Sequence, residues 1–182
     1  YGGTITLVMK WDRTYPFDTY LSTAAVNPVG GVVEKLGKLD WGIKRDEYHF
    51  LGGYVMPVHV ITGALAESWD ISPDGLHYTF HIRDGVRWHN KAPMNGRKLT
   101  AKDVEYNFHR MVGLGSGFTE AAEHLRIAKL GIVSVEATDK YTVVMKLKEP
   151  RLDALDNILD GGSGVIQPPE VIEQYGDMQD WK

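Results

Sequence analysis

The sequence contains no cysteine, and this absence excludes disulfide bonds, thiolate metal sites and cysteine nucleophiles. It also lacks a long apolar run. The longest, Tyr54 to Ala66, is interrupted by Pro57, His59 and Thr62 and is too short to cross a bilayer. No signal peptide is visible, and the chain starts at Tyr1 rather than at Met. We therefore expect a processed or trimmed N-terminus.

Clustered positive charge is also missing. Lysine and arginine together number 20 against 24 aspartates and glutamates, which gives a formal net charge of −4. The basic residues are scattered and form no stripe that could neutralise phosphates, so we expect no nucleic-acid partner. The length of 182 residues, 43% of them hydrophobic, suffices for one domain or one and a half with a real core. The end of the chain has nothing after it to close a domain, and we expect a fragment of a longer protein.

Motifs of catalysis are absent as well. Ser163 lies in "GGSGV", which does not match the G-x-S-x-G nucleophile elbow. The glycines of "GLGSGF", residues 113–118, follow a predicted helix and precede no GK[ST], so a flexible loop is favoured over a phosphate-binding loop. No H-E-x-x-H or EF-hand pattern occurs. We predict that the protein is not an enzyme, has no catalytic residues and requires no cofactor.

The clearest local signal is the stretch "WDISPDGLHYTFHIRDGVRWHN", Trp69 to Asn90. Its "PDG" and "RDG" are turn sequences, because proline presets φ, aspartate bonds the local backbone and glycine accepts positive φ. They predict a three-stranded meander made of residues 64–71, 76–82 and 86–90. Within 76–82 apolar and polar residues alternate strictly, as expected of a half-buried strand. The two predicted faces are Leu76, Tyr78, Phe80 and Ile82 on one side, and His77, Thr79, His81 and Arg83 on the other.

This strand also decides whether its histidines bind a metal. On a strand, His77 and His81 have Cα atoms roughly 13 Å apart, at about 3.3 Å per residue. One zinc ion needs its ligand nitrogens within about 2 Å. The two histidines therefore cannot chelate one ion, and we predict no metal site.

The segment "LTAKDVEYNFHRMVG" carries the start and stop signals of a helix. Thr100 is the predicted N-cap with Asp103 at N3 as an approximate capping box, and Gly113 is a natural C-terminal stop. The predicted core stripe consists of Val104, Phe108 and Met111. The predicted solvated flank consists of Glu105, His109 and Arg110.

Other elements follow from shorter patterns. They are a first strand at 4–9, a short helix within 30–41, a helix at 119–130, a hairpin of strands 132–136 and 141–147, a helix within 151–160, and a helix starting at Pro168–Pro169. In the second strand of the hairpin, Tyr141, Val143, Met145 and Leu147 share one face.

The segment from Leu65 to Met111 resembles the hallmark of the bacterial extracellular solute-binding proteins of family 5, the oligopeptide-, dipeptide- and nickel-binding proteins of ABC importers. The family pattern runs L-A-x-S-W, D-G, Y-x-F-x-L-R-x-G-V-x-W/F, L-T-A-x-D-V, and then a helix ending near an arginine. The matching residues are Leu65, Ala66, Ser68, Trp69, Asp74, Gly75, Tyr78, Phe80, Arg83, Gly85, Val86, Trp88, Thr100, Ala101, Asp103, Val104 and Arg110. Ile82 replaces the usual leucine, and the link "HNKAPMNGRKLTA" is longer than usual, which we interpret as a surface extension.

The resemblance implies a mixed α/β fold of the type II periplasmic-binding-protein class. The chain would form part of the first lobe, with an antiparallel meander and flanking helices, and the second lobe would be absent. Residues 1–30 would supply the first strand and a cleft loop, and residues 31–165 the subdomain with the meander and helix. Residues 166–182 would start the return segment into the first lobe.

The function implied is that of the extracytoplasmic substrate-binding component of an ABC importer. Such a component captures peptides in the periplasm or at the outer face of the cytoplasmic membrane and delivers them to the membrane permease. A lipid anchor at an N-terminus missing from this chain would tether it. Two alternatives stay open. One is the same scaffold binding a nickel chelate, haem, an oligosaccharide or an opine, and the other is a ligand-sensing domain of a regulator.

The resemblance also indicates where ligand would bind. By position, the loop after the first strand should face the cleft, where small residues suit close approach by an extended ligand. The candidate substrate-binding residues are Ser22, Thr23, Ala24, Ala25 and Val26, with Phe118 in a second loop. Ordinary surface loops are the alternative for both segments. Trp69 and Trp88 are predicted to pack in the core rather than to stack on a sugar.

Overall fold

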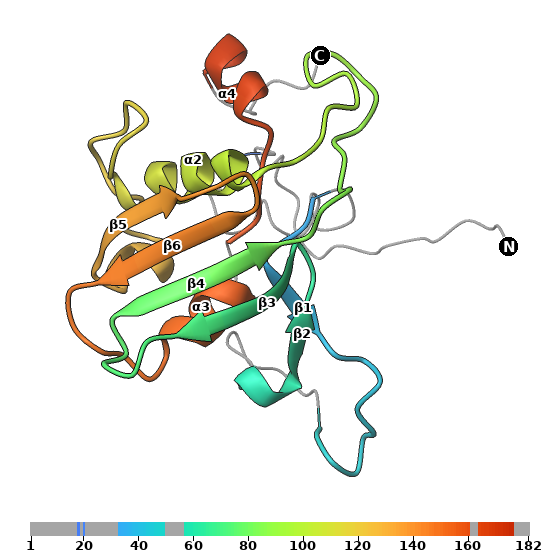
Figure 1. The fold of residues 1–182 in the computed structure, drawn as a ribbon, viewed down its shortest axis with the longest axis vertical. Helices are drawn as coiled ribbons and strands as arrows, with labels where there is room; N and C mark the ends of the chain where they lie inside the picture. The colour runs from blue at the N-terminus through green and yellow to red at the C-terminus, as the bar shows by residue number, and fades with distance from the viewer. Residues whose placement is uncertain (1–17, 19, 21–32, 50–56, 161–163, 177–182) are drawn as a thin grey trace, which may run out of the picture.

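The structure is a computed structural model that describes residues 18, 20, 33–49, 57–160 and 164–176. Its centre is a four-stranded antiparallel sheet in the order β3-β4-β6-β5 (Figure 1). The strands are β3 (Ala66–Ile71), β4 (His77–Ile82), β5 (Ile132–Ala137) and β6 (Thr142–Leu147). A second, two-stranded sheet pairs β1 (Gly37–Leu39) with β2 (Ile61–Gly63). The first predicted strand, at 4–9, lies outside the described residues.

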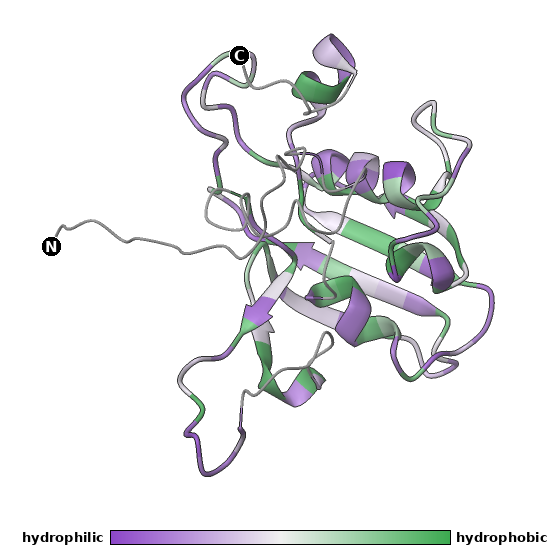
Figure 2. Ribbon diagram, turned by 180° about the vertical axis from the view of Figure 1, so that it is seen from behind, coloured by the Kyte–Doolittle hydropathy of each residue, from purple (hydrophilic) through white to green (hydrophobic). Residues whose placement is uncertain are grey.

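Two helices lie on one face of the larger sheet. Figure 1 shows α2 (Ala101–Val112) and α3 (Ala154–Leu159) behind the strands, and Figure 2, from the opposite side, shows both in front. The short η2 (Val58–Val60) precedes β2, and η3 (Ile127–Lys129) precedes β5. The last helix, α4 (Pro169–Tyr175), packs against α2. On the opposite face of β4, His77, Thr79 and His81 are half-buried among the residues that the structure describes.

Strand alternation explains why the helices lie on that face. Tyr78, Phe80 and Ile82 on β4 are buried while the residues between them are not, as the alternation predicts. On β6, Val143, Met145 and Leu147 are likewise buried, with Tyr141 packed partly against the same core. These apolar rows meet the buried stripe of α2, formed by Val104, Phe108 and Met111. One contiguous core therefore lies between sheet and helices.

Helix α2 begins and ends where its sequence predicts. Thr100 is extended at the N-cap, and Asp103 accepts a hydrogen bond from the Thr100 N–H at 2.8 Å. Gly113 is left-handed, with φ of 71°, and its N–H donates to the His109 carbonyl. Its conformation and the lack of space around it both require glycine, because a Cβ here would lie 2.6 Å from the Glu120 carbonyl carbon.

The meander prediction is wrong in its third strand. β6, not residues 86–90, pairs with β4 on the edge away from β3. Residues 86–90 instead fold back onto the link that follows them. The Trp88 N–H donates to the Arg97 carbonyl at 3.0 Å and the Leu99 N–H to the Val86 carbonyl at 2.9 Å. The apolar row of β6, formed by Val143, Met145 and Leu147, is fully buried, whereas Val86 and Trp88 are only half-buried.

Two predicted helices are also wrong. Within 30–41 the structure has strand β1, because its backbone pairs with β2. Within 119–130 only the short η3 is helical. The buried apolar residues there are Ala122, Leu125, Ile127 and Leu130, a spacing that does not follow one helix face. The hairpin of β5 and β6, α3 and the proline-initiated α4 are confirmed.

The extended link between Trp88 and Leu99 lies at the surface, as expected, since none of residues 89–98 is buried, but it is also tied into the fold. Arg97 binds both carboxylate oxygens of Asp103, at 2.9 and 2.6 Å, and both carboxylate oxygens of Glu170, one of them at 2.7 Å. Hydrogen bonds from Arg97 lower the pKa of Glu170. Burial acts in the opposite direction but is the smaller effect, so the pKa stays below its ordinary value. Arg97 therefore joins the N-terminus of α2 to α4.

Candidate functional site

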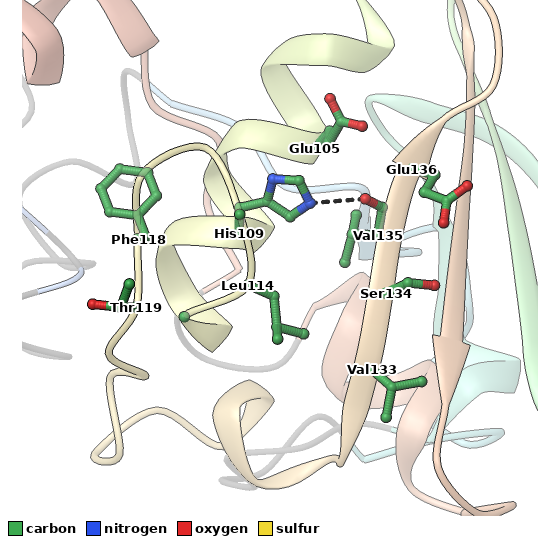
Figure 3. Close-up of a pocket in the computed structure, with 11 residues that line it drawn as sticks. Glu105, His109, Leu114, Phe118, Thr119, Val133, Ser134, Val135 and Glu136 are labelled. Atoms are coloured by element: carbon green, nitrogen blue, oxygen red, sulfur yellow. Dashed lines mark hydrogen bonds between the residues drawn. The ribbon is translucent and has the colours of Figure 1, made fainter.

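A groove of about 630 Å³ runs between the end of α2, the loop after it and the edge strand β5 (Figure 3). We call it the β5 groove. Its lining residues are Glu105, His109, Gly113, Leu114, Gly115, Phe118, Thr119, Val133, Ser134, Val135 and Glu136. The groove thus includes one of the predicted ligand-contacting residues, Phe118.

His109 holds the two walls of the β5 groove together. Its Nε2 lies 2.8 Å from the Val135 carbonyl oxygen (Figure 3), and its Nδ1 lies 2.8 Å from Ser116 Oγ. A carbonyl can only accept, so Nε2 carries the proton and donates, and in the neutral ring Nδ1 accepts from the Ser116 hydroxyl. The His109 side chain therefore connects α2 to both the loop that follows it and strand β5.

Glu105 makes a second contact with β5, one helical turn before His109. Its Oε1 accepts a hydrogen bond from the Ala137 N–H at 2.9 Å, and its Oε2 lies 2.7 Å from Lys102 Nζ. Burial alone would raise the pKa of Glu105, but the bonds from Lys102 and Ala137 outweigh it and leave the pKa below its ordinary value. Together Glu105 and His109 satisfy backbone groups on the outer edge of β5, which discourages pairing of that edge with another strand.

Phe118 packs against α2 from the loop side of the groove. Its ring meets that of Tyr106 edge to face, with centroids 5.3 Å apart, a preferred geometry for aromatic pairs. Burial, with a further contribution from Glu173, raises the pKa of Tyr106. The structure thus fixes where Phe118 lies, and its contact with a ligand stays a prediction.

The other predicted contacts, Ser22 to Val26, lie outside the described residues. Just before them, Asp18 and Tyr20 are described and are held by α2. Asp18 is fully buried, and its two carboxylate oxygens accept from the Arg110 guanidinium at 2.9 and 2.7 Å. The guanidinium carbon of Arg110 also lies 4.5 Å from the centre of the Tyr20 ring. We call this set of Asp18, Tyr20 and Arg110 the N-terminal anchor.

The anchor brings Tyr20 close to the loop of Phe118. The Tyr20 hydroxyl donates a long hydrogen bond of 3.4 Å to the Glu120 carbonyl, two residues beyond Phe118. Tyr20 and the loop of Phe118 therefore lie close together, although about a hundred residues separate them in sequence.

The prediction that Glu105, His109 and Arg110 form a solvated flank is wrong. Arg110 is only 5% exposed, and the other two are half-buried and bonded to β5. The sequence carried one signal for this: Arg110 directly precedes the core residue Met111 and follows the core residue Phe108 by two. A charged side chain so close to the core requires a partner, but that partner, Asp18, lies 92 residues away, and local patterns could not identify it.

His77 and His81 lie at the surface, each near an aspartate. His81 Nε2 lies 3.1 Å from Asp70 Oδ2, and His77 Nδ1 lies 4.0 Å from Asp74 Oδ1, all on exposed or half-exposed side chains. Across residues 33–49, 57–160 and 164–176, together with 18 and 20, no group of three histidine, aspartate or glutamate side chains is placed to hold a metal ion. Over the same described residues, no helix has the length and apolar character that a membrane span needs.

The model of the family described as bacterial extracellular solute-binding proteins, family 5, middle region, matches residues 60–181. The chain belongs to this family. The family 5 chain is 37% identical over 107 residues to the dipeptide-binding protein of Escherichia coli, in a match that covers 54% of this chain and 20% of that protein. It is 36% identical over 101 residues to di/tripeptide-binding protein 1 of Pseudomonas aeruginosa, covering 52% of this chain and 19% of that protein.

Over most of the length of the family 5 chain, its fold matches part of a solved relative. The ABC transporter-associated periplasmic binding protein DppA of Helicobacter pylori, in complex with the peptide STSA, superposes with a TM-score of 0.67 and 28% identity. The match covers 91% of this chain and 31% of that one. The mixed α/β, periplasmic-binding-protein fold expected from the sequence is thereby confirmed. The chain spans less than a third of the length of these relatives.

Proposed function

We propose that this chain is the N-terminal part of the substrate-binding component of an ABC importer, and that the whole protein captures peptides outside the cytoplasm and delivers them to a membrane permease. The observation that carries the proposal is the match to a family member solved with a bound peptide, over 91% of this chain at 28% identity. The relatives named as di- and tripeptide-binding proteins support the same ligand class. The family is a transport component, so the protein would bind its ligand without chemistry.

The described part of the chain would form a frame for the binding cleft. Residues 31–165 would be a subdomain of the first lobe, residues 1–30 would bring the cleft loop to it, and residues 166–182 would lead back into the lobe. Ligand would contact Ser22, Thr23, Ala24, Ala25 and Val26, and Phe118 from the second loop. Hinge closure of a second lobe would enclose the ligand and present the closed shape to the permease.

The proposal is tested by native mass spectrometry of the full-length protein that carries this chain, purified gently so that it keeps what it has bound. A series of small masses that resolve into peptides is the expected result. One discrete mass of another kind, such as a sugar, an opine, haem or a metal chelate, would retain the fold and refute the peptide ligand. Protein that carries no ligand and binds no added peptide would favour the ligand-sensing alternative.

A matched control uses the 182-residue chain alone. Because the proposed cleft needs a second lobe, we expect this chain to bind peptides weakly or not at all. A calorimetric isotherm at micromolar affinity or tighter would contradict the two-lobe proposal.

A further inference from the structure

We infer that Arg110 is a positioning residue for ligand binding, which acts by fixing Asp18 and Tyr20 against α2 beside the loop that carries Phe118. This inference rests on the proposed function, since it assigns a role within the same binding site. It adds a residue that does not itself touch the ligand and that lies in the hallmark helix.

The geometry of the pair requires arginine. Both terminal nitrogens of Arg110 donate to Asp18, one to each oxygen, at 2.9 and 2.7 Å, and both side chains are almost fully buried, at 6% and 0% exposed. A planar guanidinium can make this two-point contact and stack on the Tyr20 ring at the same time, and a lysine ammonium cannot. A buried pair of this kind contributes little net stability but is strongly disfavoured once one partner is removed. It therefore serves better to specify a position than to stabilise the fold.

One face of α2 sets the positions of both segments. Tyr106 and Arg110 are four residues apart and so are neighbours on the helix surface. Tyr106 holds Phe118 by its ring contact at 5.3 Å, and Arg110 holds Asp18 and Tyr20. The hydrogen bond from the Tyr20 hydroxyl to the Glu120 carbonyl links the N-terminal anchor to the loop of Phe118. The helix thus works as a common support for the chain before the cleft loop and for the loop of Phe118.

The expected effect on affinity follows from preorganisation. A ligand that binds only the positioned form has an apparent dissociation constant raised by the inverse of that form's population. If loss of the anchor leaves the segment positioned in about a tenth of the molecules, the apparent Kd rises about tenfold.

The test compares Arg110→Gln, Arg110→Lys and Asp18→Asn with Arg97→Gln in the full-length protein. Arg97 is the matched control, because it also binds carboxylates through two nitrogens but holds α4 and not the N-terminal segment. Affinity is measured by titration calorimetry with a synthetic tripeptide library, and the folded fraction by thermal unfolding. Amide hydrogen exchange at Tyr20, whose N–H donates to Asp18 Oδ1 at 3.1 Å, reports the anchor independently of any peptide.

We expect Arg110→Gln and Asp18→Asn each to raise the Kd about tenfold and to speed exchange at Tyr20, with the double variant no worse than either. Arg110→Lys should be no better than intermediate. Arg97→Gln should lower the melting temperature and leave both readouts within twofold of the parent. An Arg110→Gln protein that melts lower but binds peptide as the parent does would show a merely structural role and overturn the inference. Unchanged exchange at Tyr20 would also overturn it, whereas a parent protein that binds no peptide would refute the proposed function itself.

Discussion

Asn107 provides a quantitative test of the buried contacts that hold the end of the described chain to α2. Its side-chain nitrogen donates to the Gln167 carbonyl at 2.8 Å, and its side-chain oxygen accepts from the Gln167 N–H at 2.9 Å, as a neighbouring strand would. Asn107 and Gln167 are 3% and 2% exposed, so water does not replace these bonds. Asn107→Ala removes both at once. At about 1–3 kcal/mol for each buried group that loses its partner, we expect a loss of roughly 3 kcal/mol in unfolding free energy.

Asn157 is the matched control for this substitution. It is also 3% exposed, and its side-chain nitrogen donates to the Asp153 carbonyl at 2.6 Å. Its Oδ1 is buried and has no hydrogen-bond partner among the described residues, so Asn157→Ala also removes an unfavourable group. We expect this variant to lose no more than about 1 kcal/mol.

Urea unfolding followed by circular dichroism measures the unfolding free energy of both variants in the same chain. The difference of roughly 2 kcal/mol should appear there as a lower midpoint for Asn107→Ala, and in a thermal melt of the same samples as a melting temperature lower by about 4–8 °C than that of Asn157→Ala. Equal losses in the two variants would refute the reasoning, because the two side chains have the same size and burial and differ in what they bond. An unchanged slope with denaturant is needed for the comparison, since it shows that the same surface is exposed on unfolding.

Two further predictions concern the loop after α2 and the response to acid. Gly113→Ala should lower the unfolding free energy by about 2 kcal/mol or more, because a Cβ there meets backbone atoms of Glu120 and Ala121 at 2.6 and 2.7 Å. Gly117 is also at positive φ but has nothing within 4 Å of an added Cβ, so Gly117→Ala should lower it by only about 1 kcal/mol in the same urea titration. Glu170, whose pKa in the fold is lowered from its ordinary 4.5 by hydrogen bonds from Arg97, contributes stability that is present above that ordinary value and is lost as the pH falls through the lowered one. Glu170→Gln should therefore reduce the loss of stability between about pH 5 and pH 3, and an unchanged pH profile would contradict the pairing with Arg97.

The elements predicted correctly are those whose information is local. The capping box at Thr100 and Asp103, the stop at Gly113 and the buried stripe of α2 all lie within one short segment, and each signal favours the same helix. The alternation in β4 and β6 works in the same way. The prediction of the third strand of the meander was wrong because the information it needed is not local. Strands that are distant in sequence compete to pair with β4. Thr79 pairs with Val144, and no turn signal near β4 points there.

The candidate site depends on long-range contacts to a greater extent than the fold does. His109 reaches Val135 across 26 residues, and Arg110 reaches Asp18 across 92. A single sequence gives the chemical types of these residues but not their partners. For this reason both ends of α2 were predicted correctly, whereas the prediction that one side of the helix faces solvent was wrong. The β5 groove and the N-terminal anchor are visible only in the structure, where β5, Asp18 and Tyr20 contact α2.

If Arg110 positions the chain as inferred, the hallmark segment contributes to ligand binding as well as to the fold. Tyr78, Phe80 and Val104 belong to it and are buried where they specify the fold. Arg110 belongs to it too, yet its partner Asp18 lies outside the segment, on the chain that leads to the predicted cleft loop. A residue needed only for the core would be better served by an apolar side chain, since a buried ion pair is often no more stabilising than apolar packing of the same volume. On the inference drawn above, the buried charge on α2 fixes the position of Asp18 and Tyr20, which precede the predicted cleft loop.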